Sequence, residues 1–195
     1  MRKQCLMTHN PHCGTPWDQD AETFAKRLGP KDAAMPVDTL PGRELVSAIA
    51  NFRAAAETSI PSYWSDEDCR ELFRFTSVRT VPAGEALIRH GEPDRTLYFV
   101  LVGELEIILP SGDAFSMGRV AEVGPGSVLG ELAFFDGGRR SAGAWAVRNC
   151  EVAAMTPDQY AAFEQSHPAL ARDLLFALGR ILAMRLRRAN ARTVR

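Results

Sequence analysis

The chain has 195 residues, of which 46% are hydrophobic and 24% charged. This composition excludes wholesale disorder, and the length suits one domain with an appendage rather than two large catalytic domains. The formal net charge of −1 excludes a globally basic nucleic-acid-binding protein.

The charge is unevenly distributed along the chain. The segment from residue 169 to the end holds seven arginines and one acid, a net charge of +6, which leaves −7 on residues 1–168. The four cysteines, at positions 5, 13, 69 and 150, are too scattered for a disulfide framework. No apolar stretch reaches the ~18–20 residues of a membrane span, and no signal peptide is evident. We therefore expect a cytoplasmic protein without a transmembrane segment.

In residues 1–60 we predict a partly helical, loosely ordered N-terminal arm. Its first part is interrupted by Pro and Gly and carries one expected helix, around Asp20–Leu28. Residues 44–56 have apolar side chains at helical spacing and predict another helix. Ser65 is the expected N-cap of a short helix with three acids in its first turn, as the helix dipole prefers.

From about residue 78, short β-rich runs alternate with Gly and Pro turns, roughly every 8–12 residues. The runs cover 86–89, 97–102, 105–109, 115–123, 144–147 and 152–155. This spacing predicts a small antiparallel sandwich or barrel.

Two helices are predicted after the strands. Thr156, Pro157 and Gln159 form a capping pattern for a helix that runs to about Gln165. Pro168 begins an amphipathic helix of roughly 20 residues, with apolar side chains every three or four positions.

The stretch 124–146 carries the strongest chemical signal. Glycines 124, 126 and 130 let the backbone approach a ligand, residues 131–135 form one expected helical turn, and Arg139 and Arg140 stand among small residues. Free backbone donors beside a guanidinium describe an anion site, with phosphate as the anion. Glu131 would repel a bare phosphate but suits a ligand with hydroxyl donors, which points to a nucleotide. The alternative is a Gly-rich hairpin in which Glu131 and Arg140 form a plain ion pair.

Residues 78–190 resemble the cyclic-nucleotide-binding domain shared by catabolite activator protein, the regulatory subunits of cAMP-dependent protein kinase and gated ion channels. The resemblance rests on V-P-A-G-E-A-L at 81–87, H-G-E-P at 90–93, L-Y-F-V-L-V-G-E-L-E at 97–106, G-E-L-A at 130–133 and R-S-A at 140–142. It implies a mainly β fold: an eight-stranded, antiparallel, jelly-roll-like β-roll within residues 61–195, flanked by the N-terminal helical arm and two C-terminal helices.

The resemblance also implies a ligand and its contacts. The regulatory ligand would be a cyclic nucleotide, cAMP before cGMP. Arg140 would hold the cyclic phosphate, Glu131 would accept a hydrogen bond from the ribose 2′-hydroxyl, and backbone amides would complete the cradle. The implied binding residues are Gly130, Glu131, Leu132, Ala133, Arg140, Ser141 and Ala142.

Three residues bear on this assignment. Gly143 stands where the family often has Thr or Ser, which argues against cGMP. Arg139 replaces a common Pro and is either a second phosphate contact or a solvated side chain. Trp145 is expected to pack rather than to stack on a base.

The last helix is expected to close over the base, with Arg180, Met184 and Arg188 as candidates by location alone; a surface role for each is the alternative. Its apolar stripe is expected to pair with itself in a homodimer or with a partner protein. Because the sequence ends at Arg195, where related transcription factors continue into a helix-turn-helix, no DNA binding is expected. The segment 179–190 resembles cyclic-nucleotide domains of sulfate-permease-like transporters.

The remaining candidate residues point to no catalysis or metal chemistry. Cys5, His9, His12 and Cys13 are possible zinc ligands, but their spacing matches no known finger, and no metal site is predicted. No catalytic constellation is present, so the chain is not expected to be an enzyme. The alternative function is a scaffold that keeps the β-roll and binds no nucleotide.

Overall fold

The computed structural model describes residues 35–36, 49–52, 60–110 and 117–193. The helix predicted around Asp20–Leu28 and the Cys5–Cys13 cluster lie outside these ranges. Of the second predicted helix, residues 49–52 are described and are helical. Ile49 and Phe52 from this segment are buried in the main hydrophobic core, so this part of the predicted arm packs with the domain that follows it.

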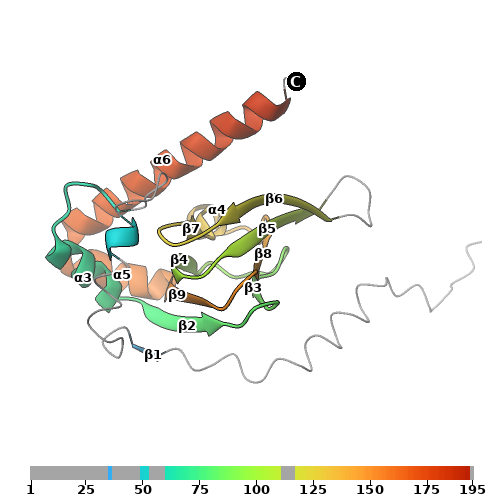
Figure 1. The fold of residues 1–195 in the computed structure, drawn as a ribbon. Helices are drawn as coiled ribbons and strands as arrows, with labels where there is room; N and C mark the ends of the chain where they lie inside the picture. The colour runs from blue at the N-terminus through green and yellow to red at the C-terminus, as the bar shows by residue number, and fades with distance from the viewer. Residues whose placement is uncertain (1–34, 37–48, 53–59, 111–116, 194–195) are drawn as a thin grey trace, which may run out of the picture. The chain divides into compact units, whose positions relative to one another are not determined.

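Two antiparallel sheets form the body of the described structure (Figure 1). The five-stranded sheet has the order β1-β2-β9-β4-β7, and the four-stranded sheet has the order β3-β8-β5-β6. The strands are β1 (Met35–Pro36), β2 (Ser77–Val81), β3 (Ala86–Ile88), β4 (Leu97–Val102), β5 (Leu105–Pro110), β6 (Met117–Val123), β7 (Val128–Leu129), β8 (Gly143–Ala146) and β9 (Cys150–Met155). The described helices are α3 (Asp66–Arg74), α4 (Glu131–Asp136), α5 (Pro157–Ser166) and α6 (Pro168–Thr193).

The predicted β-roll is confirmed, and strands β2 to β9 supply its eight strands. The two-residue β1, which pairs with β2, adds a ninth within the described residues. Neither β2 nor β7 stands among the predicted strands. In β2 the polar residues Arg79 and Thr80 weaken the apolar signal, and β7 is only two residues long.

The strands in the centre of the five-stranded sheet explain how two cores form. Side chains alternate across a strand, so Phe99 of β4 faces a core shared with the helices, while Tyr98 and Val100 face the inside of the roll. The neighbouring β9 repeats the pattern, with Ala153 on the helix side and Val152 inside. Both faces are covered, which is why these strands read as continuous apolar runs.

The predicted helix caps are confirmed. The Ser65 hydroxyl accepts a hydrogen bond from the Asp68 amide at 3.1 Å, and Thr156 accepts one from the Gln159 amide at 3.2 Å. Helix α6 has 26 residues, more than predicted. Leu174, Leu178 and Ile181 fix its first half in the core, and its second half continues past β7 and α4 (Figure 1). None of the helices in the described ranges combines the length and apolar character needed to cross a membrane.

Candidate functional site

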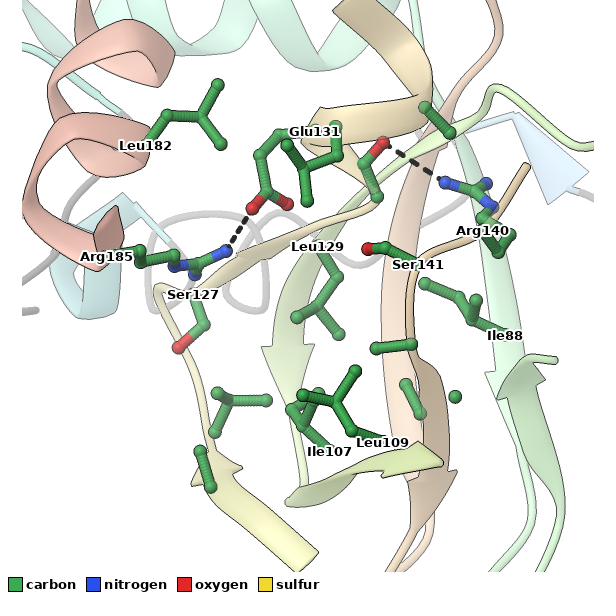
Figure 2. A pocket seen from close by; sticks show the side chains of 18 of the residues that line it. Ile88, Ile107, Leu109, Ser127, Leu129, Glu131, Arg140, Ser141, Leu182 and Arg185 are labelled. Carbon is green, nitrogen blue, oxygen red and sulfur yellow. Dashed lines mark hydrogen bonds and ion pairs between the residues drawn. The ribbon is translucent and has the colours of Figure 1, made fainter. Parts of the chain in front are cut away.

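A cavity of about 840 Å³ opens between the β-roll and α6. Its walls come from β5 and β6, from residues 125–133, from residues 140–144 and from the second half of α6. Figure 2 shows Arg140 on one side of this pocket and Arg185 of α6 on the other, with Glu131 between them. The seven residues predicted as a binding set line it: Gly130, Glu131, Leu132, Ala133, Arg140, Ser141 and Ala142.

The position of Arg140 is fixed by its backbone. Its N–H donates to Glu92 O at 3.0 Å, and its carbonyl accepts from the Gly91 amide at 2.8 Å. Residues 90–93 and residue 140, two separate motifs in the sequence, therefore form one structural unit. The arginine itself is held at a turn rather than at the end of a free loop.

The Arg140 side chain is 2% exposed and makes several hydrogen bonds. Nη1 donates to Gly130 O at 3.1 Å, and Nη2 donates to Asp94 Oδ2 at 2.6 Å and to Thr96 O at 2.7 Å. The guanidinium carbon lies 5.5 Å from the centre of the Tyr98 ring. Arg140 Nε is buried and has no hydrogen-bond partner among the described residues.

The environment of Arg140 fits an anionic ligand. An unpartnered buried donor is costly in a folded protein, and here it belongs to a guanidinium on the pocket wall. Gly130 has φ = +84° and forms the N-cap of α4. A Cβ at this position would collide with the Arg140 guanidinium and lie 2.7 Å from Thr96 O. The close packing of backbone and guanidinium therefore requires glycine at this position.

Asp94 is the acidic partner of Arg140. Burial alone would raise its pKa, but hydrogen bonds from Arg140 and Thr96 outweigh burial and bring the pKa to about 2. Asp94 Oδ2 also accepts from the Tyr98 hydroxyl at 3.1 Å. Burial, and then the charge of Asp94, raise the pKa of Tyr98. Asp94 is therefore ionised over the whole neutral range, and Tyr98 stays a hydrogen-bond donor.

A pH dependence of stability follows from the depressed pKa of Asp94. A carboxyl whose folded pKa lies below its unfolded value of about 3.9 stabilises the fold above that pH, and this contribution is lost as the pH falls toward 2. With solvent screening of a partly exposed side chain, we expect on the order of 1 kcal/mol. Asp94→Asn should flatten the unfolding free energy between pH 4 and pH 2 in urea titrations. An equally steep loss in both proteins would contradict this assignment.

Glu131 is paired with α6 rather than with Arg140. The Glu131 side chain is 8% exposed, and its Oε1 accepts from Arg185 Nη1 at 2.6 Å. Arg185 Nη2 donates to Val128 O at 3.0 Å. The interpretation of Glu131 and Arg140 as a plain ion pair is therefore wrong, because each has its own partner of opposite charge.

The other candidate residues are only partly brought to the pocket. Arg188 lines it, whereas Arg180 and Met184 do not. Met184 packs against the main core instead. Arg139 is exposed and donates to Gly91 O at 2.8 Å, away from the pocket lining, which favours the solvated interpretation.

Two residues of the site were missed in the sequence. Asp94 follows the H-G-E-P motif directly, a position from which its role could have been suspected. Arg185 stands among several arginines of α6, and the composition gave no reason to select it. Trp145 is not part of the pocket lining, in agreement with a packing role, and its neighbour Gly143 is part of it.

The β-roll places a buried arginine, a glycine-dependent turn and a carboxylate around one pocket beneath the last helix, and these groups fit a small anionic ligand. Residues 78–167 match the family model described as the cyclic nucleotide-binding domain. These residues therefore match the cyclic nucleotide-binding family, as the sequence motifs predicted.

Relatives with this domain differ widely. The chain is 30% identical over 126 residues to Glutaminase 2 of Bradyrhizobium diazoefficiens. The aligned region is 65% of this chain and 19% of that protein. It is 30% identical over 109 residues to the CRP-like cAMP-activated global transcriptional regulator of Mycobacterium tuberculosis. Here the aligned region is 56% of this chain and 46% of that protein. The chain thus spans less than half of the length of these relatives.

A solved structure supports the fold independently. The crystal structure of a cyclic nucleotide-binding domain from Methylobacillus flagellatus aligns with a TM-score of 0.68 at 24% identity. The alignment covers 80% of this chain and 86% of that one. At this identity the likeness establishes the architecture of the β-roll and its helices.

Proposed function

We propose that this chain is a regulatory module that binds a cyclic nucleotide, cAMP in preference to cGMP, in the pocket between residues 130–142 and α6. The observation that carries the proposal is the unpartnered, buried Nε of Arg140, whose guanidinium packs against Gly130. A donor of this kind suits a phosphate oxygen. The cAMP-activated relative from Mycobacterium tuberculosis supports the choice of ligand.

The proposed roles follow from the chemistry of each group. Arg140 binds the cyclic phosphate through N–H···O bonds. Glu131 accepts a hydrogen bond from the ribose 2′-hydroxyl. The backbone amides at the start of α4 have no partner within the helix and, with those of Ser141 and Ala142, complete the cradle. Leu132 and Ala133 contribute their backbone at this helix start.

The proposed preference for cAMP rests on Gly143. This residue pairs with Ile108 in the sheet and brings no side-chain hydroxyl to the pocket. A Cβ there would lie 3.3 Å from Trp145 Nε1 and 3.6 Å from Ile88 O, so the neighbours must adjust by only a few tenths of an ångström. A side chain can therefore be introduced without a severe clash.

Gly143→Thr should shift the ligand preference toward cGMP. The new hydroxyl would accept a hydrogen bond from the amino group of guanine. This interaction is worth about 1 kcal/mol and is available to cGMP only. The ratio of the cAMP and cGMP dissociation constants, measured by calorimetry on both proteins, checks this. Gly143→Ala is the matched control, since it adds a Cβ without a hydroxyl. Identical ratios in the Thr and Ala variants would contradict the proposed role of position 143.

The proposed output is a change in the position of α6. Ligand binding would favour a state in which the helix closes over the base and its apolar residues are repositioned. The partner is a second copy of the chain or another protein, contacted through α6, where Phe176 is 71% exposed. Sedimentation with and without ligand tests this output. We expect a duplex-DNA titration to stay flat.

The proposed module is not catalytic and acts in the cytoplasm. The free thiols of Cys69 and Cys150 are both buried and suit a reducing compartment. No group of three or more metal-binding side chains occurs among the described residues. Within the pocket, the polar groups suit holding a ligand rather than transferring a group.

Calorimetric titration with cAMP, cGMP and linear 5′-AMP tests the proposal. We expect binding of the cyclic nucleotides and weak or absent binding of 5′-AMP. No heat with either cyclic nucleotide, in a protein that unfolds cooperatively, would favour the second candidate, a scaffold that keeps the β-roll without a ligand.

A further inference from the structure

Arg185 links α6 to the start of α4 across the pocket (Figure 2). Its two terminal nitrogens bind two different groups: Glu131 Oε1 at 2.6 Å and Val128 O at 3.0 Å. The Arg185 side chain is 28% exposed and that of Glu131 8%, so the contact is largely shielded from water. An ion pair of this kind is screened less than a surface pair.

The pair decides the charge that a ligand meets. Arg140 is already paired with Asp94 and Glu131 with Arg185. If Arg185 were removed, a buried carboxylate would remain without compensation beside the proposed phosphate site. Such a group repels an anion. Arg185 thus offsets the charge of Glu131 and fixes the orientation of its carboxylate.

The salt bridge leaves room for a ligand hydroxyl. The described hydrogen bond engages Glu131 Oε1, while Oε2 accepts none from the residues that the structure describes. A carboxylate offers acceptor sites on both oxygens. A hydroxyl donor can therefore bind Glu131 without displacing Arg185.

We infer that Arg185 is a positioning residue that holds Glu131 for the ribose 2′-hydroxyl and so couples recognition of the sugar to the docking of α6. The inference rests on the proposed function. In this arrangement Arg185 of α6 contacts Glu131 before a ligand arrives. The ribose hydroxyl and the Arg185 guanidinium would both bind the Glu131 carboxylate, and each interaction would orient the carboxylate for the other.

The test compares cAMP with 2′-deoxy-cAMP on wild type, Arg185→Met and Arg185→Lys. In wild type, loss of the hydroxyl should weaken binding about tenfold or more, as for a hydrogen bond to a charged group. In Arg185→Met this penalty should fall to a few-fold, and Arg185→Lys should restore part of it. Arg187→Met, which removes the same charge from an exposed position of α6, should behave as wild type.

A merely structural role for Arg185 would weaken both ligands equally and leave the penalty unchanged, and that result overturns the inference. If wild type binds neither ligand, the proposed function fails instead. A second experiment measures the docking of α6 by amide hydrogen exchange without ligand. Exchange in residues 182–191 should increase in Arg185→Met and stay unchanged in Arg187→Met. Equal exchange in the two variants would show that Arg185 does not hold the helix.

Discussion

Arg140→Ala is expected to lower the affinity for cAMP by about 2–5 kcal/mol, the range for a buried charged partner that is lost. The arginine is 2% exposed, and its Nε is the donor left without a partner. Its removal takes away both the positive charge and the N–H groups that we propose to bind the phosphate. Calorimetry on wild type and variant measures the difference.

The matched control is Arg139→Ala. Arg139 is adjacent and exposed, and its hydrogen bond runs to Gly91 O rather than into the pocket. Both variants lose one positive charge, so long-range electrostatics change equally. Because Arg140→Ala also strips Asp94 of its partner, Arg140→Lys serves as a second variant that keeps a charge. Unchanged affinity in a folded Arg140 variant would remove the basis of the proposed function.

Gly130→Ala is expected to disrupt both stability and binding. At φ = +84° any residue with a Cβ is strained by about 1–2 kcal/mol. The new methyl would also displace the Arg140 guanidinium from its hydrogen bond to Gly130 O. We therefore expect a larger loss of unfolding free energy than the backbone strain alone, with a marked loss of cAMP affinity.

Gly84→Ala isolates the backbone contribution. Gly84 has φ = +83°, and a Cβ there meets nothing within 4 Å. Urea unfolding of this variant should show only the strain of about 1–2 kcal/mol, with unchanged affinity. If the two alanine variants lose equal stability and both keep affinity, the proposed contact between position 130 and Arg140 has no functional weight.

The sequence predicts the parts of this domain that have a local signal. Ser65 and Thr156 can be identified as helix N-caps because a cap depends on residues within a few positions along the sequence. Glu131 and Arg140 could be selected together because the glycine pattern around them is specific. The β-roll followed from the turn spacing and from motifs distributed over the domain.

The missed features depend on contacts between distant parts of the chain. Asp94 meets Arg140 only after the 90–93 turn pairs with the backbone of residue 140. Arg185 rather than Arg180 reaches Glu131 because the rotation of α6 is set by the core residues of its first half. Arginines occur on several faces of this helix, so their spacing alone cannot tell which one points inward.

The backbone pairing of Arg140 with Gly91 and Glu92 has a consequence for how this domain can diversify. The chain between Gly130 and Arg140 is anchored at both ends, by the guanidinium at one and by the turn at the other. The exposed residues between these anchors, such as Phe135 at 43% exposure, form an outer surface beside the pocket. Substitutions at these exposed positions would therefore leave both anchors of this segment in place.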